Sequence, residues 1–173
     1  MTTKLKLALM VILLAMTGCA DTAAPDGESH TELLHSYSFE SASDSAGWAY
    51  AGTVSIYLDA TLDTGQHCLQ VSGTDIGPQA EKILDTLREA ATLIFRYDAR
   101  CIGHTGGEVR LLSFPSAPPF PRAGSTIADT LWQNYSDTAA FPAGYPLRIW
   151  IDGNGTFATP VLVDNIRVLK IVQ

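Results

Sequence analysis

Alternation of apolar and polar residues dominates the chain from Leu34 onward. In the stretch 93–100, apolar residues occupy every second position from Leu93, and from Phe95 onward charged residues lie between them. This period of two is typical of β-strands with one buried face. We expect strands at 36–39, 52–58, 67–72, 93–100, 108–114, 146–152 and 160–171. Gly- and Pro-containing turn signals separate them, so the pattern predicts a β-sandwich or β-barrel.

The stretch 78–92 (PQAEKILDTLREAAT) is the exception to this pattern. Ile83, Leu84, Leu87 and Ala91 follow helical spacing among good helix-forming residues, which predicts a helix of about three turns. The alternative is a strand over 80–84 followed by a loop. Local pattern alone leaves both open.

The first eighteen residues have the pattern of an export signal. Lys4 and Lys6 precede ten apolar residues, 7–16, which are too few to span a bilayer. The sequence Met-Thr-Gly-Cys that ends at Cys19 resembles the lipobox of bacterial lipoproteins. This resemblance implies that residues 1–18 are a signal peptide and that the thiol of Cys19 carries a lipid. An ordinary secretory signal with a chance cysteine is the alternative.

The residues after Cys19 indicate the localisation of the protein and the bounds of its domain. Ala20, rather than Asp, follows the cysteine, and by resemblance to Gram-negative lipoproteins this favours the outer membrane. Residues 19–33 are small, polar and acidic, with one Pro and one Gly, as expected of a flexible linker. A single domain over 34–173 is long enough to bury a core.

The chain is acidic, with a formal net charge of −7. An acidic surface disfavours nucleic acid, because affinity for phosphate depends on Lys and Arg. It also disfavours adsorption on anionic lipid, so we expect the acyl chains at Cys19 to hold the protein at the membrane.

Three cysteines are present. With Cys19 used for lipid, Cys68 and Cys101 remain as a possible disulfide pair in an oxidising compartment. Such a bridge would close a loop of about 34 residues and contribute about 4 kcal/mol in the chain-entropy model. Two buried thiols are the alternative, and no CxxC or HxxxH spacing suggests a metal site instead.

Several segments together resemble a known family. In chain order they are Phe39-Glu40, Gly47-Trp48, TGQHCLQVSG at 64–73, ATLIFRYDAR at 91–100, LWQNYS at 131–136 with Phe141-Pro142, and VDNIRV at 163–168. Their order resembles the carbohydrate-binding-module jelly rolls with a galactose-binding-like fold, of the kind attached to cellulases and xylanases. The resemblance implies one all-β jelly-roll β-sandwich over about 36–173. It also favours the strand at 80–84, with a loop or single helical turn at 85–90.

The resemblance further implies one structural calcium ion near the chain ends. The matching residues are Glu40, after the first Phe, and Asp164 of the last strand. Calcium takes six to eight oxygen ligands, so two carboxylates with backbone carbonyls would suit it. Otherwise these acids cap turns or pair with arginine.

Glycan ligands of such folds often lie across the concave sheet face, where aromatic rings stack on sugars. Strand parity directs Arg148, Trp150 and Asp152 outward from one strand. It directs Arg96 and Asp98 outward from another. These five side chains are the expected ligand-binding residues, with Trp150 as the main candidate. The alternative for Trp150 is that it covers a hydrophobic patch under a loop.

Catalysis is not expected. The sequence contains no GxSxG elbow, no HExxH motif and no Gly-rich phosphate loop after a strand.

Trp48 and Trp132 match positions that are usually structural in the family, so both are expected in the core. The leading hypothesis is therefore a non-catalytic glycan-binding lipoprotein. A structural or protein-interaction lipoprotein, with envelope proteins as partners and no sugar site, is the alternative.

Overall fold

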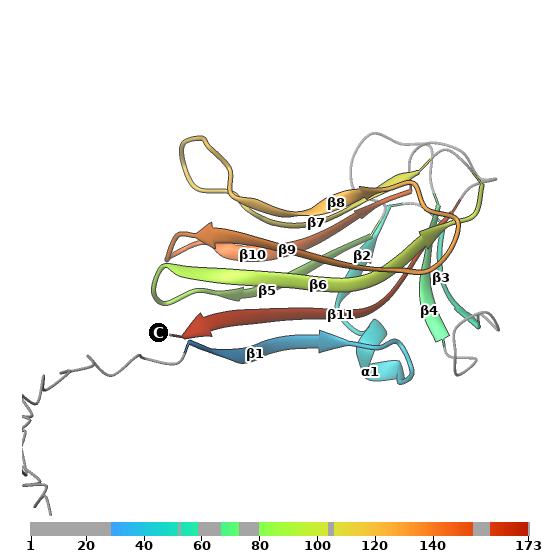
Figure 1. The fold of residues 1–173 in the computed structure, drawn as a ribbon, viewed down its shortest axis with the longest axis horizontal. Coiled ribbons are helices and arrows are strands. Elements are labelled where there is room, and N and C mark those ends of the chain that lie inside the picture. The colour runs from blue at the N-terminus through green and yellow to red at the C-terminus, as the bar shows by residue number, and fades with distance from the viewer. Residues whose placement is uncertain are drawn as a thin grey trace, which may run out of the picture.

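Two antiparallel β-sheets make up almost all of the structure, a computed structural model that describes residues 29–51, 53–58, 67–72, 80–103, 106–153 and 160–172 (Figure 1). The six-stranded sheet contains β1 (His30–Tyr37), β3 (Thr53–Leu58), β4 (His67–Ser72), β6 (Ala91–Cys101), β9 (Gln133–Phe141) and β11 (Val161–Val172). The five-stranded sheet contains β2 (Trp48–Tyr50), β5 (Ala80–Thr86), β7 (Gly107–Ser113), β8 (Arg122–Ile127) and β10 (Pro146–Asp152). One short helix, α1 (Ala42–Ser45), is the remaining element of the described residues. The expected all-β jelly-roll sandwich is confirmed.

Strand β11 organises the six-stranded sheet, whose order is β3-β4-β11-β6-β9. On one side β11 pairs with β6 along most of its length. On the other side its first residues, 161–163, pair with β4, and residues 166–172 pair with β1. The register against β6 shifts between Asp164 and Arg167. Asp164 therefore lies where β11 passes from one neighbouring strand to the next.

The core lies between the two sheets and follows the predicted alternation. Leu93, Phe95, Tyr97 and Ala99 of β6 are at most 1 % exposed. Their counterparts on β10 are Leu147, Ile149 and Ile151, which are equally buried in the same cluster. Because alternate residues of a strand point to opposite faces, the residues between them point away from the core on the outside of each sheet.

The ambiguous stretch after residue 78 is a strand. Strand β5 pairs with both β2 and β10, and Leu84 is buried while its neighbour Ile83 is 57 % exposed. The strand prediction is confirmed, and it extends to Thr86. Sheet pairing prevails here over local helix propensity.

Three strands were not expected from the pattern, and one begins earlier than expected. Strand β1 starts at His30, so residues 30–33 belong to the sheet rather than to the linker. Strand β2 is too short to show a period, and β8 carries Gly124 at its centre. Strand β9 is the edge of its sheet and is mostly exposed, so its residues show little apolar alternation.

The expected disulfide is not present. Cys68 and Cys101 are both buried thiols, and they are not bonded to each other. Strand β11 separates them, because Cys68 is on β4 and Cys101 is on β6. Neighbouring strands are about 4.8 Å apart, so strands on either side of a third exceed the roughly 7 Å Cα separation that a disulfide tolerates. The Cys101 thiol instead donates to the carbonyl oxygens of Gly103 and Asp129 at 3.2 and 3.3 Å.

Residues 1–28, with Cys19 and the expected signal peptide, lie outside the described residues. Within the described residues, no helix is long and apolar enough to cross a membrane.

Candidate functional site

The five expected ligand-binding residues lie on two opposite faces of the sandwich. Arg148, Trp150 and Asp152 project outward from β10 of the five-stranded sheet. Arg96 and Asp98 project outward from β6 of the six-stranded sheet. Since the two inner faces pack against each other, the structure brings together the first three residues but not all five.

Trp150 belongs to a groove on the outer face of the five-stranded sheet, here called the aromatic groove. Its volume is about 530 Å³. It is lined by Glu108, Arg110, Leu112, Phe114, Pro119, Phe120, Arg122 and Trp150. The rings form a continuous series, because the centroid of Phe114 lies 5.7 Å from that of Phe120 and 6.4 Å from that of Trp150. Phe114 and Phe120 are 42 % and 49 % exposed, so a ligand can reach both.

Charged side chains surround these rings and hold one another in place. The Arg148 guanidinium lies over the Phe114 ring, 5.5 Å from its centroid, and Nη1 donates to Glu81 Oε1 at 2.7 Å. Arg148 Nε is buried and has no hydrogen-bond partner among the described residues. Arg110, directly opposite Trp150 on β7, donates to Glu108 Oε1 at 3.3 Å. The groove thus combines apolar ring faces with donors and acceptors of fixed orientation.

Asp152 extends this surface beyond the rings. It pairs in register with Glu108 and lines a neighbouring hollow of about 310 Å³ with Gly107, Glu108 and Thr126. Glu108 belongs to both hollows, so Trp150 and Asp152 lie along one continuous stretch of the sheet face.

Sequence reasoning missed most of the aromatic groove. Strand parity could have found Arg110 and Phe114, because the alternate residues Val109, Leu111 and Ser113 are buried. Phe120 lies in the loop between β7 and β8, where no period exists to place it. The Ser113 amide donates to the Pro121 carbonyl at 3.2 Å, which closes this loop and brings Phe120 beside Phe114.

The two other tryptophans differ from each other. Trp48 is 7 % exposed in the core, as expected, and its Nε1 donates to the carbonyl of Asp44. Trp132 is half-buried rather than in the core, and the Arg100 guanidinium lies 5.7 Å from its ring centroid. The expectation for Trp132 was wrong, because this residue precedes the edge strand β9 and lies beside Arg100, which points away from the core on β6.

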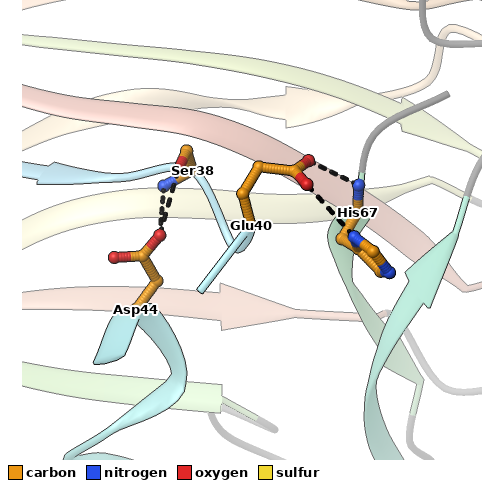
Figure 2. Close-up of polar contacts among 4 residues, drawn as sticks. All are labelled: Ser38, Glu40, Asp44 and His67. Carbon is orange, nitrogen blue, oxygen red and sulfur yellow. Dashed lines mark hydrogen bonds and ion pairs between the residues drawn. The ribbon is translucent and has the colours of Figure 1, made fainter. Parts of the chain in front are cut away.

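The two expected metal ligands lie near the junction of β1 and α1 with β4 and β11. Glu40 Oε1 accepts a hydrogen bond of 2.6 Å from the His67 amide, and Oε2 lies 3.1 Å from His67 Nδ1 (Figure 2). Beside it, Asp44 Oδ2 accepts hydrogen bonds from the amide and the hydroxyl of Ser38 (Figure 2). Phe39, just before Glu40, has a φ of 58°, which turns the chain sharply after β1.

Asp164 is fully buried and incompletely satisfied. Oδ1 accepts a hydrogen bond of 2.7 Å from the Asn165 amide, whereas Oδ2 has no partner among the described residues. Burial raises the pKa of Asp164 to about 7, and the negative charges of Asp98, Glu40 and Asp44 add to the rise. A buried carboxylate oxygen without a partner, near three other carboxylates, is an environment that a cation would stabilise. No three acidic, His or Cys side chains among the described residues converge as a ready metal cluster, so other ligands would be carbonyls or water.

Comparison with known proteins defines the fold. No protein-family model and no curated protein matches the sequence. Among solved structures, the CBM22-1 xylan-binding domain of Paenibacillus barcinonensis Xyn10C is 17 % identical, with a TM-score of 0.60 over 82 % of this chain and 96 % of that one. A family 16 carbohydrate-binding module matches at 16 % identity and a TM-score of 0.55, over 71 % of this chain and 90 % of that one.

A third solved structure contains a ligand. The CBM22-1-GH10 modules of Clostridium thermocellum Xyn10B, in complex with xylohexaose, match at 11 % identity and a TM-score of 0.54. The match covers 80 % of this chain and 28 % of that one. Together these structures show that the chain has the β-sandwich fold of carbohydrate-binding modules.

The buried Asp164 carboxyl predicts a pH-dependent stability when divalent ions are chelated. Its pKa of about 7 in the folded state exceeds its ordinary value of 3.8, so the folded state holds the proton more tightly. The contribution of the neutral carboxyl is fully present below about pH 4 and is lost as the pH rises through about 7. Relative to Asp164→Asn, the wild type should lose stability over this interval, with an upper bound on the order of 4 kcal/mol.

Denaturant unfolding in EDTA from pH 4 to 9 measures this difference. Asp85→Asn on β5, an exposed carboxylate, is the matched control and should parallel the wild type. If the unfolding free energies of the wild type and Asp164→Asn changed in parallel with pH, the raised pKa of Asp164 would be contradicted.

Proposed function

We propose that this domain is a non-catalytic glycan-binding domain whose ligand lies across the outer face of the five-stranded sheet. The observation that carries the proposal is the series of Trp150, Phe114 and Phe120 rings in the aromatic groove, bordered by fixed arginine and glutamate side chains. Rings of this kind stack against the apolar faces of pyranose sugars. The fold shared with carbohydrate-binding modules supports the proposal, and fold alone does not fix the ligand.

In this proposal each group has a distinct role. Trp150 supplies the main stacking surface, with Phe114 and Phe120 extending it toward the β7–β8 loop. Arg148 and Arg110 donate to sugar hydroxyls, and Asp152 with Glu108 accepts from them at the far end. The xylan-binding and xylohexaose-bound neighbours make xylan the first polysaccharide to test. No bond is made or broken, and the groove holds a chain in place.

Removing the main ring should remove most of the binding. Trp150→Ala should weaken binding to xylohexaose at least about tenfold, because the central stacking surface is lost. Isothermal titration calorimetry with xylohexaose measures the affinity, and affinity electrophoresis extends the comparison to other neutral polysaccharides. The matched control is Trp132→Ala, which removes a half-buried tryptophan from the other sheet and should change the affinity less than about twofold.

Equal xylohexaose affinities of Trp150→Ala and the wild type would contradict the proposed position of the ligand in the aromatic groove. Absence of binding to every glycan tested would favour the alternative class, a structural or protein-interaction protein.

We call Asp164 with the nearby carboxylates of Glu40, Asp44 and Asp98 the acidic cluster. Calcium is the ion we propose there, held by Asp164 and Glu40 together with backbone carbonyls. The support is Asp164 Oδ2, which has no partner in the portion of the chain that the structure describes, and the carboxylates around it. An ion there would neutralise repulsion between the acids and stabilise the junction of β1, β4 and β11. Its role would be structural, since the cluster lies away from the aromatic groove.

Calcium should raise the thermal midpoint of the wild type at pH 8 by several degrees relative to EDTA, since an ion that binds only the folded state stabilises it. Asp164→Asn should abolish the rise and Glu40→Gln should reduce it, while Asp85→Asn should respond like the wild type. Differential scanning calorimetry measures the midpoints. An unchanged wild-type midpoint would rule out the ion.

For the whole chain we propose a lipoprotein of the outer membrane, held there by lipid on Cys19. The support is the lipobox-like sequence before Cys19 and Ala20 after it. Cys19→Ser should release the protein from the membrane fraction of expressing cells, and labelling with a radioactive fatty acid should be lost. Retention of Cys19→Ser in washed outer membranes would overturn the anchor.

A further inference from the structure

Two arginines lie directly opposite each other on the outer face of the six-stranded sheet. Arg167 of β11 pairs in register with Arg96 of β6. The same row continues to Ser36 of β1 on one side and to Ser136 of β9 on the other. These four strands run side by side in Figure 1, with β11 and β6 in the middle. The two positive charges are therefore central on this face and not at its edge.

Neither guanidinium is neutralised within the described part of the chain. Arg96 and Arg167 are both exposed, and neither forms an ion pair or a hydrogen bond with a described residue. By contrast, Arg110 and Arg148 on the other sheet each pair with a glutamate. Like charges directly opposite on neighbouring strands are destabilising. A chain with net charge −7 nevertheless places two cations together here.

A polar groove of about 310 Å³ surrounds this pair, and we call it the arginine groove. It is lined by Arg96, Asp98, Asn134, Ser136, Asn165 and Arg167. Asp98, the one acid among these residues, is occupied by amides: Asn134 Nδ2 donates to Oδ1 at 2.8 Å, and Asn165 Nδ2 donates to Oδ2 at 2.9 Å.

Those two hydrogen bonds fix the amide groups beside the arginines. Asn165 has a φ of 49° and sits where the register of β11 shifts, so the backbone irregularity directs its side chain toward Asp98. With their nitrogens committed to Asp98, the side-chain oxygens of Asn134 and Asn165 remain as acceptors. The groove thus offers two guanidinium donors, two amide acceptors and the Ser136 hydroxyl.

We propose that the arginine groove is a second glycan site, which binds an oxyanion carried by an acidic polysaccharide. The guanidinium pair matches the charge and the paired oxygens of a carboxylate or sulfate. The amide oxygens and the hydroxyl suit the neighbouring sugar hydroxyls. The shared chemistry is the oxyanion, borne either by a uronic acid or by a sulfate ester. Because the two grooves lie on opposite faces, one neutral and one acidic chain can bind together.

The test compares oligogalacturonate, which carries carboxylates, with dextran sulfate and with neutral dextran, using the purified protein at low salt. The wild type should bind at least one of the acidic polymers and not dextran, and the stronger of the two identifies the oxyanion. Arg96→Gln/Arg167→Gln should lower that affinity at least about tenfold, because charge-assisted hydrogen bonds are lost. Added salt should weaken wild-type binding.

A control of equal net charge separates the site from general attraction. Lys82→Gln/Arg88→Gln removes two positive charges near β5, and it should bind the acidic polymer within about twofold of the wild type. Trp150→Ala should also retain acidic binding, while Arg96→Gln/Arg167→Gln retains the xylohexaose affinity of the wild type. These variants therefore test the proposal for the arginine groove separately from the proposal for the aromatic groove.

Folding is checked in the same variants. Loss of like-charge repulsion should leave the thermal midpoint of Arg96→Gln/Arg167→Gln equal to or above that of the wild type. The proposal is overturned if the wild type binds neither acidic polymer, if this folded variant binds as the wild type does, or if the charge-matched control loses as much affinity.

Discussion

The packing of two sheets through one face each is the constraint on which the rest of this structure depends. Every strand that contributes alternate residues to the shared core must direct the others to solvent, and the two outer faces point in opposite directions. Each outer face therefore has its own chemistry. The face containing Trp150 carries rings and paired charges, whereas the other face carries Arg96 and Arg167, which form no ion pair with a described residue, together with amides.

Strand β11 couples the core to both the acidic cluster and the arginine groove. Its buried residues complete the six-stranded sheet, and its neighbour on one side changes from β4 to β1. Asp164 and Asn165 occupy this change, where the usual ladder is interrupted. Asp164 is buried with one oxygen that has no partner within the described part of the chain, and Asn165 turns its side chain to Asp98. A single irregularity in one strand thus places both residues beside Asp98.

Alternation in the sequence was enough to predict the sandwich, the buried side of β6 and β10, and the outward direction of Trp150, which is half-buried. It could not show which strands share a sheet, so Arg96 and Asp98 were grouped with Trp150 across the core. Cysteine count predicted a bridge that the intervening β11 rules out. Phe120 became part of the aromatic groove through loop closure, and Arg167 met Arg96 through pairing of strands about 70 residues apart, neither of which a local pattern encodes.

The central claim is that a neutral glycan binds on the five-stranded sheet and not on its counterpart. Backbone amide chemical shifts recorded by NMR during titration with a neutral oligosaccharide such as xylohexaose test it most directly. The account predicts that perturbed amides cluster in β7, β10 and the 114–121 loop, while those of residues 96–98 and 165–167 stay unchanged. Perturbations centred on the six-stranded sheet, or none at saturating ligand, would contradict it.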